Sequence, residues 1–120
     1  MRATYYFGCF IAWLLPVLNV HAATELEQRA AISRSVKSLF LAENFPELER
    51  MAQSYRTQRS RTTSGLWKLT LFYAGIQAAL NSNDDDTNID KRFLALEEKT
   101  KNWRQKYPQS PTAHIVHSMI

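Results

Sequence analysis

The segment from Leu66 to Leu80 limits the possible folds most strongly, because Lys68 is its only charged residue and nearly all its other side chains are apolar. A helix on a protein surface has one apolar stripe, whereas a helix that is apolar all round is buried. The segment therefore predicts a central helix that other elements must cover. Small residues would let a neighbouring helix approach closely there, and they are Ala74, Gly75, Ala78 and Ala79.

Two further helices are predicted before this segment. The first spans about residues 24–43, and Pro46 begins the second, which ends near Ser60. Both have apolar residues at helical spacing, Ile32, Val36, Leu39, Phe40 and Leu41 in the first and Leu48, Met51, Ala52 and Tyr55 in the second. The short connection between them favours an antiparallel helix hairpin.

Two more helices are predicted after the central helix. Ser64 or Thr63 can cap the central helix, and Thr87 can cap a fourth helix over residues 88–106. The fourth helix places Ile89, Phe93, Leu96, Thr100, Trp103 and Tyr107 on one face. Ser110 and Pro111 begin a fifth helix over residues 111–120. The predicted fold is all-α, with antiparallel helix hairpins in a tetratricopeptide-like array or a small helical bundle.

Residues 1–22 are typical of a cleavable secretory signal peptide. A positively charged start precedes an uncharged apolar run over about residues 5–18. Val20 and Ala22 are residues that signal peptidase accepts, so cleavage is predicted between Ala22 and Ala23. The alternative, an uncleaved membrane anchor, is less favoured because a span needs about 20 apolar residues.

Cleavage would change the composition of the exported part, residues 23–120, which is long enough for one domain. The single cysteine, Cys9, would leave with the signal peptide, so disulfide, thiol and cysteine–metal chemistry are excluded. The net charge of +4 would fall by one with the loss of Arg2, leaving a mildly basic protein. We expect it in the periplasm or outside the cell, without a stable membrane anchor.

Two patterns are similar to metal sites but lack the necessary ligands. Residues 84–90 place oxygen ligands at alternate positions, yet Ile89 and Ala95 stand where an EF-hand requires glycine and glutamate. His114 and His117 lie three positions apart without a third ligand nearby. We therefore expect no metal or other cofactor.

A basic stretch is the best candidate binding surface, because no acidic residue occurs between Glu49 and Asp84. Trp67 follows a loop and is the aromatic residue that we most expect at the surface. An anion or a partner could bind here, whereas the alternative is a solvated helix end whose cations favour the helix C-terminus. No nucleic-acid-binding fold is recognised. The candidate residues are Arg56, Arg59, Arg61, Trp67 and Lys68.

Several motifs resemble known helical families. Residues 39–48 and 103–111 are similar to the turns of tetratricopeptide units, although the regular repeat is missing. The segments Ser64–Leu69, Phe72–Gly75 and Trp103 with residues 107–113 resemble exported bacterial proteins known as domain of unknown function 4034. This resemblance covers most of the exported part. It implies a helical fold, export and further helices beyond Ile120, and it implies no activity.

The function predicted from these features is binding of a protein or peptide by a non-catalytic helical-repeat module. No nucleophile elbow, phosphate loop or zinc-protease motif occurs in the chain. The alternative is the N-terminal part of an envelope enzyme whose site lies beyond the chain end. The apolar residues of the segment 111–120 also suggest self-association.

Overall fold

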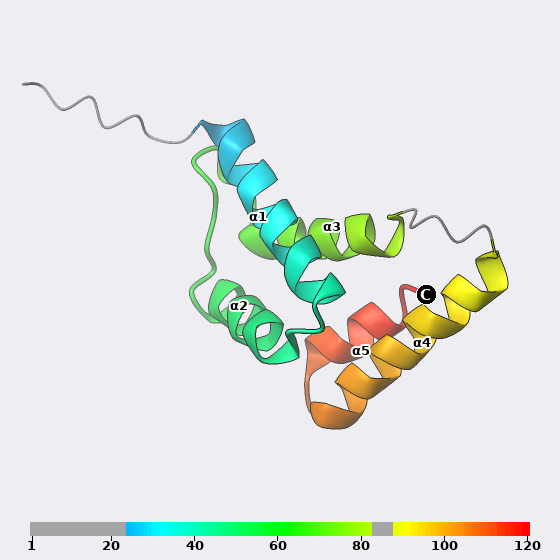
Figure 1. Ribbon diagram of the computed structural model, residues 1–120. Helices are drawn as coiled ribbons and strands as arrows, with labels where there is room; N and C mark the ends of the chain where they lie inside the picture. Colours follow the sequence, from blue (N-terminus) through cyan, green and yellow to red (C-terminus); the bar gives the residue numbers. More distant parts are fainter. Residues whose placement is uncertain (1–23, 83–87) are drawn as a thin grey trace, which may run out of the picture.

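The computed structural model describes residues 24–82 and 88–120 (Figure 1). Within these residues the protein is all-helical, which confirms the predicted fold class. The predicted cleavage site between Ala22 and Ala23, the acidic residues 84–86 and the proposed cap Thr87 lie outside the described residues. The helices are α1 (Glu25–Leu41), α2 (Phe45–Thr57), α3 (Lys68–Leu80), α4 (Ile89–Lys106) and α5 (Pro111–His117).

Helix α3 is largely buried, as its apolar composition predicts, and α1 packs against it more extensively than against any other helix (Figure 1). Gly75 makes this approach possible. A Cβ atom at Gly75 would lie 2.8 Å from the Ser33 carbonyl oxygen and 2.8 Å from the Val36 Cβ. Ala79 is also buried, whereas Ala74 and Ala78 face solvent and do not serve the close approach.

The aromatic part of the core joins three helices around Trp103 of α4, which is fully buried. The Phe45 ring stacks on the indole with 5.1 Å between ring centroids, and the Phe40 ring lies at 6.2 Å. Aromatic pairs in this range add about 0.5–1.5 kcal/mol each beyond the area that they bury. Trp103 therefore ties α4 to α1 and α2.

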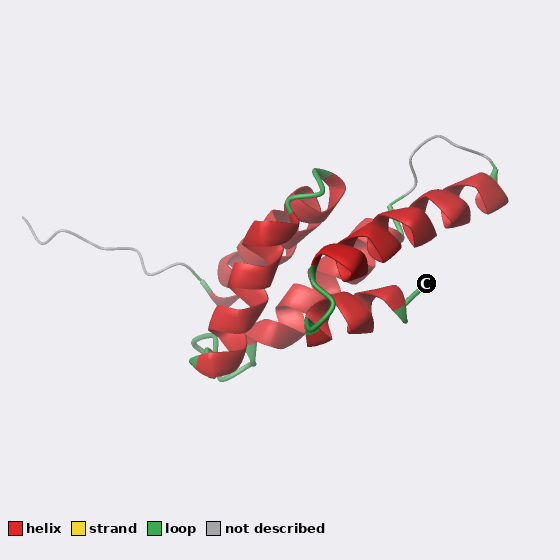
Figure 2. Ribbon diagram, turned by 90° about the horizontal axis from the view of Figure 1, so that it is seen from below, coloured by secondary structure: helices red, strands yellow, loops and turns green. Residues whose placement is uncertain are grey.

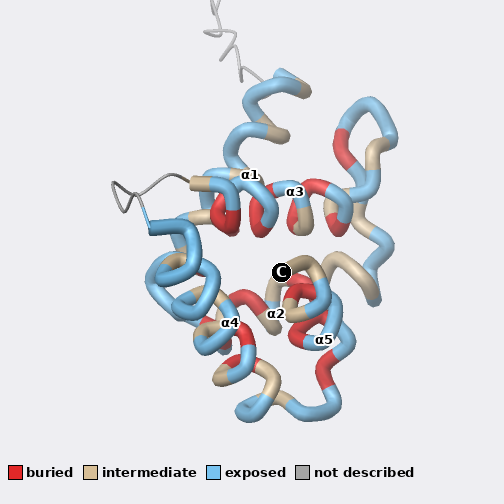
Figure 3. Tube along the Cα trace, turned by 90° about the vertical axis from the view of Figure 1, so that its right-hand side faces the viewer, coloured by how far each residue is buried: buried red, intermediate tan, exposed pale blue. Residues whose placement is uncertain are grey.

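The helix hairpins are arranged around this core. Helix α2 turns back beneath α1, and α5 folds back alongside α4 (Figures 1 and 2). The buried positions of all five helices face the interior of the bundle (Figure 3). The expected α1–α2 hairpin is thus present, but the main neighbour of α1 is α3. A repeat arrangement stays a prediction.

Local signals account for most helix starts. Thr24 and Glu27 form a complete capping box at α1, and Asn44 accepts a hydrogen bond from the Glu47 amide at α2. The Ser110 side chain accepts from the Ala113 amide, which confirms the predicted cap of α5. The predicted start of α2 at Pro46 is wrong by one residue, because Asn44 is the cap and Phe45 is the first helical residue.

Two helices end on residues with left-handed backbones that are not glycine. Glu43 has φ 55° after α1 and Arg59 has φ 49° after α2. The amide of the following residue then bonds back into the last turn, from Asn44 to the Leu39 carbonyl and from Ser60 to the Tyr55 carbonyl. Glycine usually occupies this position, so the sequence carried no signal for these ends, which were predicted at Glu43 and Ser60.

Three other predicted boundaries are corrected. Helix α3 begins at Lys68 instead of Leu66, and neither Thr63 nor Ser64 caps it. Asn88 caps α4 by accepting from the Lys91 amide, so the helix begins at Ile89. Helix α5 ends at His117, three residues before the predicted end. Val116 is fully buried, and Met119 and Ile120 pack against the core, so much of the apolar surface of residues 111–120 is covered.

Candidate functional site

The connection between α2 and α3 carries most of the predicted binding residues. Its two arms run antiparallel, with an isolated bridge between Arg61 and Trp67. The Thr62 amide donates to the Leu66 carbonyl at 2.8 Å, and the Lys68 amide donates to the Ser60 carbonyl at 2.9 Å. Gly65 closes the tip with φ 88°, a conformation that glycine adopts without steric cost.

Helix α1 anchors this connection through Glu25. The Thr62 and Ser64 hydroxyls each donate to its carboxylate at 2.7 Å, and the Ser64 amide donates at 3.0 Å. The Thr62 hydrogen bond, followed by those from Arg29 and Ser64, lowers the pKa of Glu25 from 4.5 to about 2. Thr63 and Ser64, expected to cap α3, therefore bind α1 instead, Thr63 through Gln28.

Arg61 and Trp67 are direct neighbours across the two arms. Their hydrogen-bond pattern is that of a non-hydrogen-bonded antiparallel pair, in which opposite side chains lie closest together on one face. Trp67 is 40% exposed, an unusual state for a residue that is mostly buried in proteins. The expectation that Trp67 reaches the surface is confirmed.

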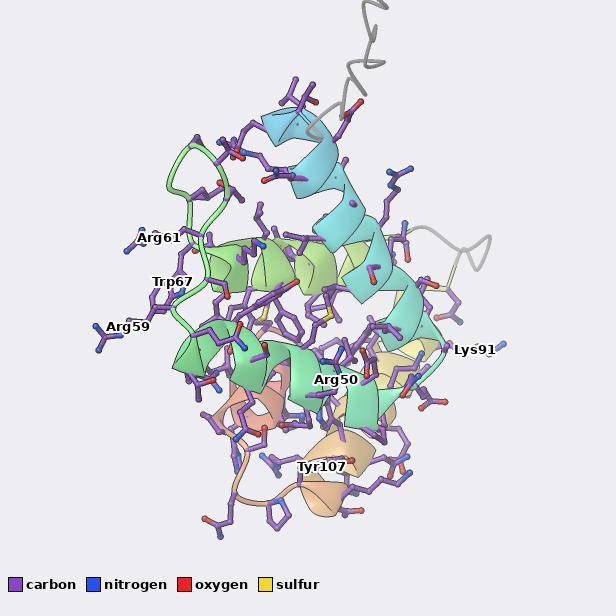
Figure 4. All side chains as sticks on the ribbon, turned by 90° about the vertical axis from the view of Figure 1, so that its left-hand side faces the viewer. Arg50, Arg59, Arg61, Trp67, Lys91 and Tyr107 are labelled. Atoms are coloured by element: carbon purple, nitrogen blue, oxygen red, sulfur yellow. The ribbon has the colours of Figure 1, made fainter. Side chains whose placement is uncertain are left out.

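Arg59 completes this surface. Figure 4 shows Arg59, Arg61 and Trp67 projecting outward from the same edge of the molecule. We call these three residues the arginine–tryptophan edge. Within residues 24–82 and 88–120, neither guanidinium contacts a carboxylate, and the only described partner of the Arg61 side chain is the Gly65 carbonyl, at 2.8 Å. The edge therefore presents two uncompensated cations beside an aromatic ring.

Two other cations of the basic stretch serve the fold instead. Arg56 points inward and donates to the Thr112 hydroxyl at 3.1 Å and to the Tyr73 hydroxyl at 3.4 Å. Arg50 pairs with Glu47 on its own helix. Lys68 is half-buried at the start of α3. Of the five predicted residues, the structure brings Arg59, Arg61 and Trp67 together at one edge. The Arg56 side chain turns toward α5, which sequence proximity does not show.

The two histidines of α5 are each held within the domain. His117 Nδ1 lies 2.9 Å from the Thr100 hydroxyl, and His114 Nε2 lies 2.8 Å from the Pro108 carbonyl. Among the described residues no group of three potential metal ligands comes together.

The first half of α4 has an exposed apolar surface that was not predicted. Ile89 and Phe93 were predicted to share one face of the helix with Trp103, yet Trp103 is fully buried whereas Ile89 is 80% exposed and Phe93 is 46% exposed. Leu94 is exposed as well. Leu41 of α1 and Leu96 of α4 help to line a pocket of about 220 Å³. The apolar residues have helical spacing along the whole of α4, but the other helices cover only the second half of this helix (Figure 2).

The arginine–tryptophan edge suits binding better than catalysis. Arginine stays charged at all ordinary pH values and donates in a planar fork, which suits bidentate carboxylate recognition. It is a poor general base for the same reason. The indole adds a flat apolar face on which a ligand or a guanidinium can stack.

No protein-family model, curated protein or solved structure is significantly similar to this chain. The resemblance to domain of unknown function 4034 therefore stays a prediction. None of the described helices is long and apolar enough to cross a membrane.

Proposed function

We infer that this protein is a non-catalytic helical module that binds a protein partner outside the cytoplasm. One observation carries the proposal: Trp67 is 40% exposed directly opposite Arg61, on a loop that hydrogen bonds hold in place. Tryptophan and arginine are the residues most enriched at the energetic centres of protein interfaces. The signal-peptide pattern of residues 1–22 supports the location.

The supporting loop matters because binding sites gain affinity when their side chains are held before the partner arrives. Glu25 fixes Thr62 and Ser64, and the bridge aligns Arg61 with Trp67. The partner would thus meet a surface that is already ordered.

Site-specific photo-crosslinking in the producing cells tests the proposal. A photoreactive amino acid replaces Thr70, which is exposed in the first turn of α3 and whose amide bonds to the Trp67 carbonyl at 3.0 Å. A matched probe replaces Lys101, which is exposed on α4. We expect a discrete protein adduct at position 70 that is lost in Trp67→Ala, since removing a central tryptophan costs about 2 kcal/mol or more.

The probe at position 101 should not give this adduct. An adduct at position 70 that survives Trp67→Ala, or adducts that are the same at both positions, would contradict the proposal.

A further inference from the structure

We propose that the arginine–tryptophan edge recognises an extended acidic segment of its partner, with carboxylates on Arg59 and Arg61 and the segment lying along Trp67. This inference rests on the proposed function and names the chemistry of the partner. It follows from the charges of the edge, from its free backbone groups and from the surfaces that surround it.

The charge of the arginine–tryptophan edge favours an anionic partner. Arg59 and Arg61 contact no carboxylate among the described residues, in contrast to Arg29 and Arg50, which pair with Glu25 and Glu47. A carboxylate binds arginine through two parallel hydrogen bonds, each of which is about twice as strong as a hydrogen bond between neutral groups. Aspartate and glutamate side chains therefore fit the two guanidinium groups.

The backbone of Arg61 favours an extended peptide. Arg61 and Trp67 form a non-hydrogen-bonded pair, so their own backbone groups point away from each other. Neither the amide nor the carbonyl of Arg61 makes a hydrogen bond with any residue in the described ranges. A peptide strand can pair with these groups by edge addition, while its alternate side chains reach the arginine and tryptophan.

The surroundings disfavour a membrane surface. Membrane-binding surfaces combine cations with several adjacent apolar side chains. The exposed apolar residues Ile89, Phe93 and Leu94 belong to the first half of α4, with Lys91. Figure 4 shows Lys91 on the side of the molecule opposite Arg59 and Arg61. Among the described residues of the α2–α3 connection, Trp67 is the only large hydrophobic residue that is exposed.

Calorimetric titration of the purified full chain with two synthetic peptides tests the inference. One peptide alternates glutamate and threonine, and the other alternates glutamine and threonine, so they differ only in charge. Alternation places all the acidic side chains of an extended peptide on one face. We expect the glutamate peptide to bind and the glutamine peptide not to bind. Raising salt from about 0.1 M to about 1 M should weaken the binding, since the screening length falls from about 10 Å to about 3 Å.

Two variants locate the binding site. Arg59→Gly removes a guanidinium at a left-handed position that glycine tolerates, so the fold should be retained. In combination with Arg61→Glu, it should lower the affinity for the glutamate peptide at least about tenfold, or by about 1.4 kcal/mol. The matched control Arg34→Gln with Lys101→Glu makes the same change in charge at exposed positions on α1 and α4, and it should leave affinity unchanged.

Equal binding of both peptides, or equal losses in the edge variant and the control, would overturn the inference. So would binding to anionic phosphatidylglycerol vesicles without binding to the glutamate peptide. The photo-crosslinking result is independent of ligand charge. An adduct at position 70 that depends on Trp67, together with a failed glutamate peptide, would reject the acidic chemistry and leave the proposed function standing.

Discussion

The Trp103 indole Nε1 donates a hydrogen bond to the Glu49 carboxylate at 2.7 Å, across 54 positions of sequence. The same carboxylate accepts from the Ser110 hydroxyl at 2.7 Å and 2.8 Å, and Ser110 caps α5. One side chain of α2 thus satisfies the buried indole of α4 and orients the cap of α5. This carboxylate therefore connects α2 to both α4 and α5.

Replacement of Glu49 should therefore destabilise the protein. Glu49→Ala leaves the buried indole N–H without an acceptor, and we expect a loss of about 1–3 kcal/mol in the free energy of unfolding. Glu49→Gln retains an acceptor and should lose less. Urea unfolding measures both, with Glu47→Ala as the control, because its exposed ion pair with Arg50 contributes about 1 kcal/mol or less. Equal stability of Glu49→Ala and Glu47→Ala would show that the network is not needed.

Gly75→Ala should also destabilise the protein, although alanine favours a helix. The new methyl group would meet the Ser33 carbonyl and the Val36 side chain, each at 2.8 Å. Overpacking of this kind costs about 1–3 kcal/mol. Most of this range exceeds the gain in helix propensity, which is about 1 kcal/mol. Thermal unfolding measures the result against Ala74→Val, an enlargement at an exposed position of the same helix. A higher melting temperature for Gly75→Ala would mean that α1 can shift away from α3.

The Glu25 carboxylate should make stability depend on pH in acid. Its pKa of about 2 in the folded protein, against 4.5, means that folding favours the charged form. Its contribution is complete above about pH 4.5 and is lost as the pH falls through about 2. The difference in the free energy of unfolding between the original protein and Glu25→Gln should therefore decrease as the pH falls from about 4.5 to about 2. A difference that stays constant from pH 6 to about pH 2 would contradict the assignment.

Hydrogen exchange gives a local readout of the same contact. The Ser64 amide donates to Glu25 at 3.0 Å, so its exchange should quicken in Glu25→Gln. The Gly65 amide, which donates to the Thr62 carbonyl, serves as the internal comparison because its acceptor is unchanged.

Arg56→Ala should affect stability, whereas Arg59→Ala should affect binding. Arg56 joins α2 to α5 through Thr112 and to α3 through Tyr73, so its loss should cost about 1 kcal/mol at this half-buried site. Arg59 makes no such contact within the described part of the chain. Denaturant unfolding and glutamate-peptide titration of both variants separate the two roles. If Arg56→Ala left stability unchanged and weakened peptide binding, Arg56 would be a binding residue and not a structural one.

Helix positions could largely be predicted because their signals are local. Thr24, Pro46 and Ser110 mark helix starts through their own backbone or side-chain chemistry. The ends at Leu41 and Thr57 were missed because Glu43 and Arg59 take the left-handed conformation where glycine would have been the signal. The exposure of Ile89 and Phe93 could not be predicted, because helical spacing defines a face but does not show what covers it.

The sequence by itself determined the helical class, the central place of α3 and a set of five candidate binding residues that includes Arg59, Arg61 and Trp67, because these depend on periodicity and residue type. Only the tertiary structure separated Arg56 from Arg59 and Arg61. Arg56 and Thr112 lie 56 positions apart, and such a contact exists only after α2, α3 and α5 have packed. The same packing gives Glu25 its partners on the distant loop, and these partners hold Arg61 and Trp67 in place.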